Sequence, residues 1–114
     1  MKHLTKILKA LSDGNRLRIL KMLEAKPLCV CEINEVLGLA VSTTSNHLSI
    51  LKEAGLIFEQ KESKWVNNYL NRVTQQQYAQ ELLPLLQTWL NDDRTIKDDR
   101  KKAGSVNRLE LCKG

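Results

Sequence analysis

The stretch of sequence that decides the fold is CVCEINEVLGLAVSTTSNHLSILKEAG, residues 29–55. Its apolar residues recur at helical spacing in two short runs, which predicts two helices. The first helix ends at Gly38, and the second begins with Ser42 as its N-cap and ends at Gly55. Two short helices joined by a tight turn form the layout of a helix-turn-helix.

The second of these helices opens with a run of polar residues. Side chains on the first turns of a helix that lies in the major groove reach base edges, so this run is expected to contact double-stranded DNA. The alternative is that Ser42 is a cap or a phosphate contact and that the other side chains form a solvated face. The position of the helix between a turn and a basic hairpin favours DNA. The candidate DNA-binding residues of this helix are Ser42, Thr43, Thr44, Ser45, Asn46 and His47.

Two β-prone runs follow, LIFEQK at 56–61 and WVNNYL at 65–70, and together they predict a hairpin. A basic hairpin after a recognition helix is a wing. Lys61 and Lys64 are expected to contact phosphates or the adjacent minor groove, where contacts set the register and carry little sequence information. Trp65 and Tyr69 are expected to pack the wing onto the body of the domain.

The remaining elements are helical. Amphipathic spacing predicts a helix over residues 3–11 and a second helix that ends near Pro27. A further helical stretch covers residues 74–90, where Pro84 either kinks the helix or starts a new one. Aromatic residues make up 4% of the chain, so Leu, Ile and Val build the core, which suits helix-on-helix packing. The expected fold is mainly α with a small β-hairpin, a winged helix-turn-helix.

Length and charge restrict the class of protein. The 114 residues suffice for one compact domain, expected at residues 1–90, followed at residues 91–114 by a charged tail that reads as a solvated helix end or a disordered segment. The net charge of +5 is compatible with a polyanionic partner. There is neither a long apolar run nor a secretory signal, so a cytoplasmic protein without a membrane partner is expected.

The chain contains three cysteines, Cys29, Cys31 and Cys112. An odd number in a reducing compartment indicates thiols and not a disulfide framework. Cys29 and Cys31 are either small core residues or a chelating pair. Residues two apart point about 200° apart in a helix but share a face in an extended segment, so a shared ion requires an unwound first helical turn. The helix N-terminus is expected to lower the pKa of these cysteines.

Four motifs together resemble the ArsR/SmtB family of metalloregulatory repressors. They are LSDGNRLRIL at 11–20, CVCE at 29–32, STTSNHLSILKEAGLI at 42–57 and KWVNNYLN at 64–71. The resemblance extends from residue 4 to the end of the last apolar helix. It implies a homodimeric repressor that occupies operator DNA as the apo dimer and is released when an ion binds the CVCE motif, which resembles the start of the metal box in arsenic and cadmium/lead sensors.

The resemblance also implies an inducer. Thiolates select soft or borderline ions, and the resemblance implies arsenite or antimonite held by Cys29 and Cys31. Cadmium, lead, zinc, or a redox or sulfur species sensed by the same cysteines are the alternatives. Arsenic sensors of the best-known type have a third cysteine where this chain has Asn34, so the third ligand is Cys112, His3 or solvent. Residues 74–90 contain no His or Asp, which excludes the last-helix zinc and nickel site of the family.

A single helix-turn-helix reads too few base pairs for useful specificity, and repressors of this family pair two across a near-palindrome. The homodimer surface is expected on two apolar stripes that also serve the monomer core. Their residues are Leu4, Ile7, Leu8, Leu11, Leu82, Leu86 and Trp89. An enzyme is not expected, because the sequence offers no nucleophile with a nearby base and no phosphate loop.

Overall fold

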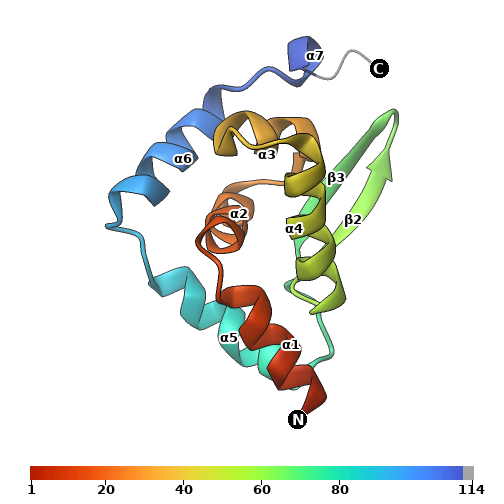
Figure 1. Cartoon of the computed structure of the whole chain (residues 1–114), viewed down its shortest axis with the longest axis vertical. Helices are drawn as coiled ribbons and strands as arrows, with labels where there is room; N and C mark the ends of the chain where they lie inside the picture. Colours follow the sequence, from red (N-terminus) through yellow and green to blue (C-terminus); the bar gives the residue numbers. More distant parts are fainter. Residues whose placement is uncertain (112–114) are drawn as a thin grey trace.

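The computed structural model describes residues 1–111 (Figure 1). The elements in order are α1 Lys2–Leu11, α2 Gly14–Ala25, β1 Leu28–Cys29, α3 Val30–Leu37, α4 Val41–Glu53, β2 Ile57–Glu62, β3 Trp65–Leu70, α5 Gln77–Thr88, α6 Arg94–Ser105 and α7 Arg108–Leu111. The predicted helices and the hairpin are present, so the mainly α architecture is confirmed. None of the helices in the described residues is long and apolar enough to cross a membrane.

The helix-turn-helix consists of α3 and α4. Gly38 ends α3 in the left-handed region at φ 69°, where a residue without a Cβ is not strained. The N-cap of α4 is Ala40, whose carbonyl accepts the N–H of Thr43 at 3.0 Å. The prediction that Ser42 caps this helix is therefore wrong. The helix begins one residue before Ser42, which lies exposed in the first turn, because a backbone carbonyl supplies the first helical acceptor.

The wing is the hairpin of β2 and β3, and the short strand β1 extends it to a three-stranded antiparallel sheet in the order β1-β3-β2. Leu28 stands opposite Asn68, and Cys29 stands opposite Asn67. The hairpin turns at Ser63, which adopts φ 59°. The sequence did not predict β1, and its presence means that Cys29 belongs to the same sheet as the wing.

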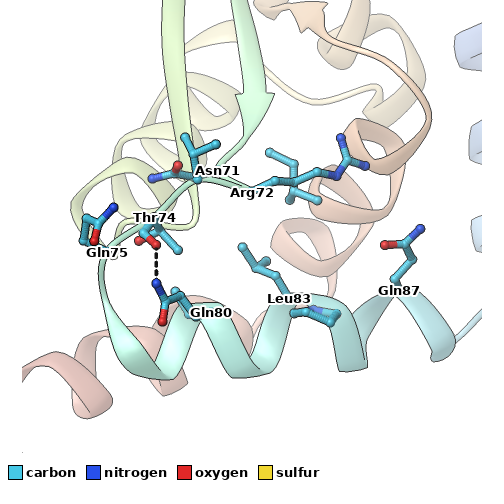
Figure 2. A pocket seen from close by; sticks show the side chains of 11 residues that line it. Asn71, Arg72, Thr74, Gln75, Gln80, Leu83 and Gln87 are labelled. Atoms are coloured by element: carbon cyan, nitrogen blue, oxygen red, sulfur yellow. Dashed lines mark hydrogen bonds between the residues drawn. The ribbon is translucent and has the colours of Figure 1, made fainter.

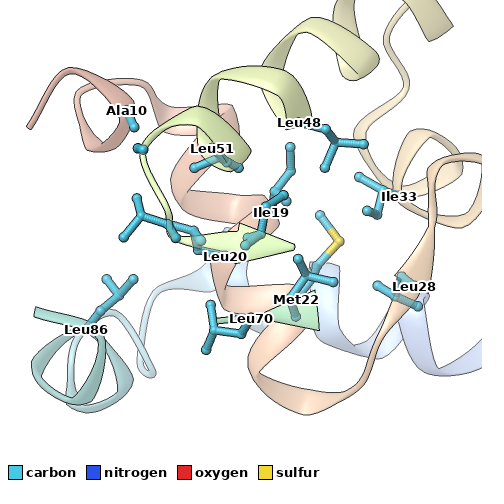
Figure 3. Close-up of a cluster of buried hydrophobic side chains, with 14 of the residues drawn as sticks. Ala10, Ile19, Leu20, Met22, Leu28, Ile33, Leu48, Leu51, Leu70 and Leu86 are labelled. Carbon is cyan, nitrogen blue, oxygen red and sulfur yellow. The ribbon is translucent and has the colours of Figure 1, made fainter. Parts of the chain in front are cut away.

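The core is built around α2, which lies in the middle of the molecule with the other helices around it (Figure 1). Ile19, Leu20 and Met22 of α2 are at most 1% exposed. Apolar side chains from eight other elements and the α4–β2 connection complete this cluster, part of which is drawn in Figure 3. Burial of each Leu or Ile side chain stabilises the fold by about 1.5–3 kcal/mol. This packing sets the position of α4 and of the sheet relative to α2.

Composition predicted a solvated or disordered tail after residue 90, and this prediction is wrong for the helix that follows in the described residues. Residues 94–105 form α6, which packs along α2 with Ile96 and Ala103 buried. Asp99 is 3% exposed and pairs with Arg18 of α2. The charges of α6 are thus partly satisfied by charges of α2. Composition cannot reveal such a pairing, because the two helices are far apart in the sequence.

Helices α1 and α5 contact each other at one end of the molecule (Figure 1). Pro84 lies inside α5, which continues past it as a single helix. Ile7 and Leu86 are each 1% exposed, so these two predicted dimer residues belong to the monomer core. Leu8 and Trp89 are 52% and 49% exposed and stay available for a partner.

Candidate nucleic-acid interface and thiol site

The outer face of α4 carries small polar side chains. Ser42, Thr43, Ser45 and Asn46 are exposed. They offer hydroxyl and amide groups that suit base edges and phosphate oxygens. Because α4 contacts β2 and lies beside the wing (Figure 1), the helix and the hairpin adjoin on one side of the molecule.

Two predicted DNA-contact residues face the protein interior instead. Thr44 is 0% exposed, and its Oγ1 donates to Oδ1 of Asn34 in α3 at 2.5 Å. His47 is 9% exposed, and its Nδ1 lies 3.1 Å from Nη1 of Arg16 in α2. The prediction that both side chains contact DNA is therefore wrong. Thr44, His47 and Leu51 recur at intervals of three and four residues, which was the available signal for an inner face.

Arg16 joins three helices, and sequence reasoning did not single it out. Its Nε donates to the carbonyl of Ala10 at 2.9 Å, and its Nη2 donates to the carbonyl of Lys9 at 3.1 Å, both at the end of α1. The same guanidinium contacts His47. Because arginine is always a donor, the ring nitrogen that faces it acts as an acceptor. Arg16 thus sets the position of α4 relative to the end of α1.

The end of the hairpin carries the predicted wing residues. Lys61 and Lys64 are exposed there, and Nζ of Lys64 lies 5.1 Å from the centre of the Trp65 ring. Tyr69 stacks on Phe58 of the neighbouring strand with ring centroids 5.2 Å apart. Tyr69 therefore stabilises the hairpin itself and does not attach it to the body, which corrects its predicted role.

Cys29 is buried where β1 meets α3. It is 4% exposed, and its backbone N–H donates to Oε1 of Glu32 at 2.9 Å. Burial raises the pKa of Cys29 above its usual value and outweighs the lowering by a backbone hydrogen bond from Glu32 and by the charge of Arg108. The expectation that the helix N-terminus lowers the pKa is wrong for Cys29, because the loss of hydration has the larger effect.

Cys31 lies in the first turn of α3 and is half-buried. The backbone of Cys29 is extended, with φ −84° and ψ 166°, whereas Val30 and Cys31 already belong to the helix. An extended backbone, which would place both cysteine side chains on one face, is present at Cys29 but not at Cys31. To hold one ion between the two sulfur atoms, the first turn of α3 has to unwind.

A residue that sequence reasoning missed lies beside this site. Arg108 of α7 donates from Nη2 to Oε1 of Glu32 at 2.8 Å and to Oδ1 of Asn67 at 2.7 Å. Its guanidinium lies 4.8 Å from the centre of the Trp65 ring. Burial acts to raise the pKa of Glu32, but hydrogen bonds from Arg108 and Cys29 outweigh it and hold that pKa below its usual value. No local pattern distinguishes Arg108 from the other charges of its stretch.

The described residues supply part of an ion site. Within residues 1–111, no group of three or more His, Cys, Asp or Glu side chains is arranged to hold a metal ion. Cys31 forms a disulfide bond in the structure, so the expectation that the cysteines are all thiols is wrong for Cys31. Cys29 and Cys31 supply two sulfur donors to a soft ion only after that bond is reduced, and an ion that takes three donors needs another. The candidate Cys112 lies outside the described residues. Helix α1, which carries His3, lies at the opposite end of the molecule from α3 (Figure 1), which argues against His3 of the same chain.

A cavity of about 470 Å³ lies between α5 and the connection from β3, and Figure 2 shows the side chains that line it. Its polar lining consists mainly of amides such as Asn71 and Gln75, and Leu83 contributes an apolar wall. Nε2 of Gln80 donates to the carbonyl of Thr74 at 2.8 Å. The lining contains no carboxylate, histidine or cysteine, so it offers no nucleophile with a base for catalysis.

Comparison with known proteins identifies similar sequences. The model of a family described as bacterial regulatory protein, arsR family, matches residues 13–58. The cadmium resistance transcriptional regulatory protein CadC of Listeria innocua is 39% identical over 66 residues, which are 57% of this chain and 56% of that protein. The arsenical resistance operon repressor of Escherichia coli is 38% identical over 66 residues, again 57% and 56% of the two chains. The chain thus spans about half the length of the curated relatives it matches.

Solved structures show the same fold. HlyU from Vibrio cholerae is 31% identical with a TM-score of 0.63 and matches 76% of this chain and 90% of that chain. The homodimeric winged helix-turn-helix DNA-binding domain of Mb0332 from Mycobacterium bovis, a possible ArsR-family transcriptional regulator, is 25% identical with a TM-score of 0.65, over 80% of this chain and 81% of that chain. The winged helix-turn-helix fold is confirmed, and the relatives are transcriptional regulators and not enzymes.

Proposed function

Because the chain belongs to the ArsR family of bacterial regulatory proteins, we propose that it is a metalloid-responsive transcriptional repressor. The apo homodimer binds operator DNA in the cytoplasm through α4 and the wing, and it leaves the DNA when arsenite or antimonite binds Cys29 and Cys31. The observation that carries this proposal is the exposed polar face of α4 beside a wing with lysines at its end.

The DNA contacts are of two kinds. Asn46 and the hydroxyls of Thr43 and Ser45 contact base edges in the major groove, where an amide recognises adenine through two hydrogen bonds. Ser42, in the first turn of α4, and the two lysines of the wing contact phosphates. Phosphate contacts set the register and add affinity that depends on salt.

The buried pair of α4, Thr44 and His47, has a positioning role in this proposal. Thr44 ties α4 to Asn34 of α3, and His47 ties it to Arg16 of α2. These contacts hold the axis of α4, so they affect all DNA sequences alike and do not select among bases.

A second copy of the chain covers apolar surface on α1 and α5. Leu8, Leu85 and Trp89 are 52%, 52% and 49% exposed. Large apolar side chains exposed on two helices that contact each other indicate an interface. The homodimeric state of the Mb0332 domain supports this interpretation. Two copies present two α4 helices to major grooves about 34 Å apart, one turn of DNA.

The names of the relatives support a thiophilic ion as the inducer. One relative is a cadmium resistance regulator and the other an arsenical resistance repressor, so cadmium, lead and zinc stay alternatives to arsenite and antimonite. Soft thiolates select such ions over Mg²⁺ and Ca²⁺. When bound, trivalent arsenic or antimony supplies bonds to sulfur that pull donor atoms together. The residues of this chain respond by unwinding the first turn of α3.

Cys112 is the proposed third thiolate. It follows Leu111 directly in the sequence, and Leu111 lines a cavity together with Glu35 and Val36 of α3. Solvent takes the third position if Cys112 does not contribute. X-ray absorption at the arsenic edge counts the sulfur neighbours in the wild type and in Cys112→Ser, and an unchanged number excludes Cys112 as a ligand.

A change in the first turn of α3 reaches the DNA-binding face by two routes. Through the sheet, Cys29 stands opposite Asn67 of the wing strand β3. Through the helix pair, Asn34 of α3 accepts the hydroxyl of Thr44 in α4. Ion capture therefore alters the placement of both the wing and α4, and operator affinity falls.

An electrophoretic mobility shift with the DNA upstream of the protein's own gene tests this function. The wild type should bind without ion and be released by arsenite. Cys29→Ser and Cys31→Ser should each bind DNA nearly as well as the wild type, because neither sulfur belongs to α4 or to the exposed wing. Each should stay bound at the arsenite concentration that releases the wild type. A wild type that binds no upstream DNA contradicts the repressor function.

Parallel titrations separate the inducers. Cadmium, lead and zinc are added to the same complex, and the ion with the lowest releasing concentration is the inducer. Release by an oxidant or a persulfide donor, and by no ion, would instead favour a redox or sulfur switch at the same cysteines. Release of both serine variants at wild-type arsenite concentrations would make the two cysteines structural.

A further inference from the structure

Arg108 joins the start of α3 to the wing from a helix that belongs to neither. We propose that its guanidinium is a positioning residue that transmits a change in the first turn of α3 to the wing. Its regulatory consequence, loss of DNA affinity, rests on the proposed function. The structural link itself does not depend on any ion or on DNA.

On the side of α3, the link is the carboxylate of Glu32, which is 4% exposed. Its Oε1 accepts the backbone N–H of Cys29 at 2.9 Å and Nη2 of Arg108 at 2.8 Å. Glu32 is the third residue of α3, so its distance from Cys29 depends on the first turn being helical. If that turn unwinds, the carboxylate cannot keep both donors in place.

On the side of the wing, the same Nη2 donates to Oδ1 of Asn67 at 2.7 Å. The side chain of Asn67 in turn donates to Glu62, which also accepts the hydroxyl of Tyr69. The guanidinium lies 4.8 Å from the centre of the Trp65 ring. One cation therefore contacts two residues in the first half of β3, the strand that pairs with β1 and with the outer strand of the wing.

The chemistry of the contacts makes this link strong and dependent on geometry. The side chain of Arg108 is 25% exposed and that of Glu32 is 6% exposed, so water competes little for either. Hydrogen bonds between a guanidinium and a carboxylate are about twice as strong as neutral ones. One nitrogen serves both acceptors, so a displacement of Glu32 also displaces the guanidinium from Asn67 and Trp65. The position of the wing therefore depends on the first turn of α3 being helical.

Amide hydrogen exchange of the apo protein tests the link without ion or DNA. In Arg108→Ala, exchange in residues 28–33 and in residues 65–70 should rise together by about tenfold, the loss expected from one charge-assisted hydrogen bond. Arg108→Lys should restore part of the protection, because an ammonium keeps the charge. The control Arg94→Ala, whose side chain is 93% exposed on α6, should match the wild type.

Wild-type exchange in either segment of Arg108→Ala would overturn the proposal. Should that variant fail to fold, Arg108→Gln replaces it, since an amide keeps a donor for Asn67 and removes the charge. For this variant the rise should be larger in residues 28–33 than in residues 65–70. If amide exchange in a folded Arg108→Gln protein rises equally in the two segments relative to the wild type, the link through Glu32 is overturned.

The regulatory consequence is measured as the ratio of DNA dissociation constants with and without arsenite. Arg108→Ala should bind arsenite with an affinity within several-fold of the wild type, because it removes no sulfur, and the ratio should fall at least tenfold. A variant that is released like the wild type contradicts the transmission role. If the wild type itself is not released by any ion, the proposed sensing function fails, and the exchange experiment still decides whether Arg108 links the two segments.

Discussion

The guanidinium of Arg18 meets both carboxylate oxygens of Asp99, at 2.8 and 2.9 Å, although the residues are 81 positions apart. The pair holds α6 against α2, with Asp99 almost fully buried and Arg18 partly exposed. A second link between the same helices joins Arg100 to Glu24 at 2.6 Å. Because α2 is the centre of the core, α6 is part of the folded domain.

Asp99→Ala should lower the free energy of unfolding by about 2–3 kcal/mol, since it leaves the Arg18 guanidinium without its partner in a partly desolvated position. Urea unfolding followed by circular dichroism measures the loss. The neighbouring Asp98→Ala is the matched control, because Asp98 is exposed and lies 3.9 Å from an exposed arginine. Equal losses in the two variants would show that the contact between α6 and α2 adds little stability.

Asp13 should give the protein an acid-dependent stability. Burial acts to raise the pKa of Asp13, but the backbone N–H groups of Arg16 and Asn15 and the charge of Arg16 outweigh it and lower that pKa. The resulting stabilisation is present above the usual carboxyl pKa and is lost as the pH falls through the lowered value. Asp13→Ala should cost about 1 kcal/mol near neutral pH, the loss of a helix N-cap.

Asp13→Asn is the control for the charge, because Asn caps a helix as well as Asp does. Unfolding curves at a series of pH values should show the wild type losing its advantage over this variant as the solution is acidified. An advantage that stays constant down to the lowest pH would mean that the Asp13 carboxylate does not titrate as its contacts require.

Two neighbouring positions of α4 should respond differently on DNA. Asn46→Ala should cost about 1–3 kcal/mol on the operator and much less on random DNA, because an exposed amide reads bases. Thr44→Val keeps the shape of the buried side chain and removes its hydrogen bond to Asn34, so it should weaken both kinds of DNA equally. Fluorescence anisotropy with both DNA sequences measures the two ratios. Equal losses for Asn46→Ala would make Asn46 a phosphate contact.

DNA affinity should fall steeply with salt. If each dimer contacts six or more phosphates through Ser42, the wing lysines and helix ends, affinity should fall by roughly a thousandfold or more between about 50 and 200 mM salt. Lys64→Ala should reduce the slope of log affinity against log salt by about one for each phosphate that a subunit no longer neutralises. A flat salt response in the wild type contradicts the phosphate contacts.

The dimer should depend on the exposed apolar side chains of α1 and α5. Leu85→Glu places a charge on a position that is 52% exposed in the monomer, so the monomer should fold normally while self-association weakens at least tenfold. Sedimentation equilibrium measures the association. Val66→Glu is the control, because Val66 is 42% exposed on the wing, away from both helices. A Leu85→Glu protein that remains dimeric places the interface elsewhere.

Local patterns in the sequence were sufficient for most elements of the fold, but not for β1 or α6. Apolar spacing predicts α1, α2, α3 and α4, and alternating β-prone runs predict the hairpin, because helix and strand periods are properties of short segments. Gly38 marks the end of α3 for the same local reason. The sequence also identified the pair Cys29 and Cys31, whose spacing is visible without a structure.

Contacts between distant residues were decided by the tertiary structure. Thr44 and His47 lie in a polar run that is typical of a surface. In the structure they face the interior, where Thr44 is hydrogen-bonded to Asn34 and His47 to Arg16. The charged stretch after residue 90 looks solvated, but α2 supplies opposite charges for it. Burial, which raises the pKa of Cys29, likewise depends on packing from several elements. A sequence displays charge and polarity residue by residue, whereas burial and pairing arise when the chain brings separate segments together. The core, the recognition face and the position of Arg108 could therefore be identified only from the folded structure.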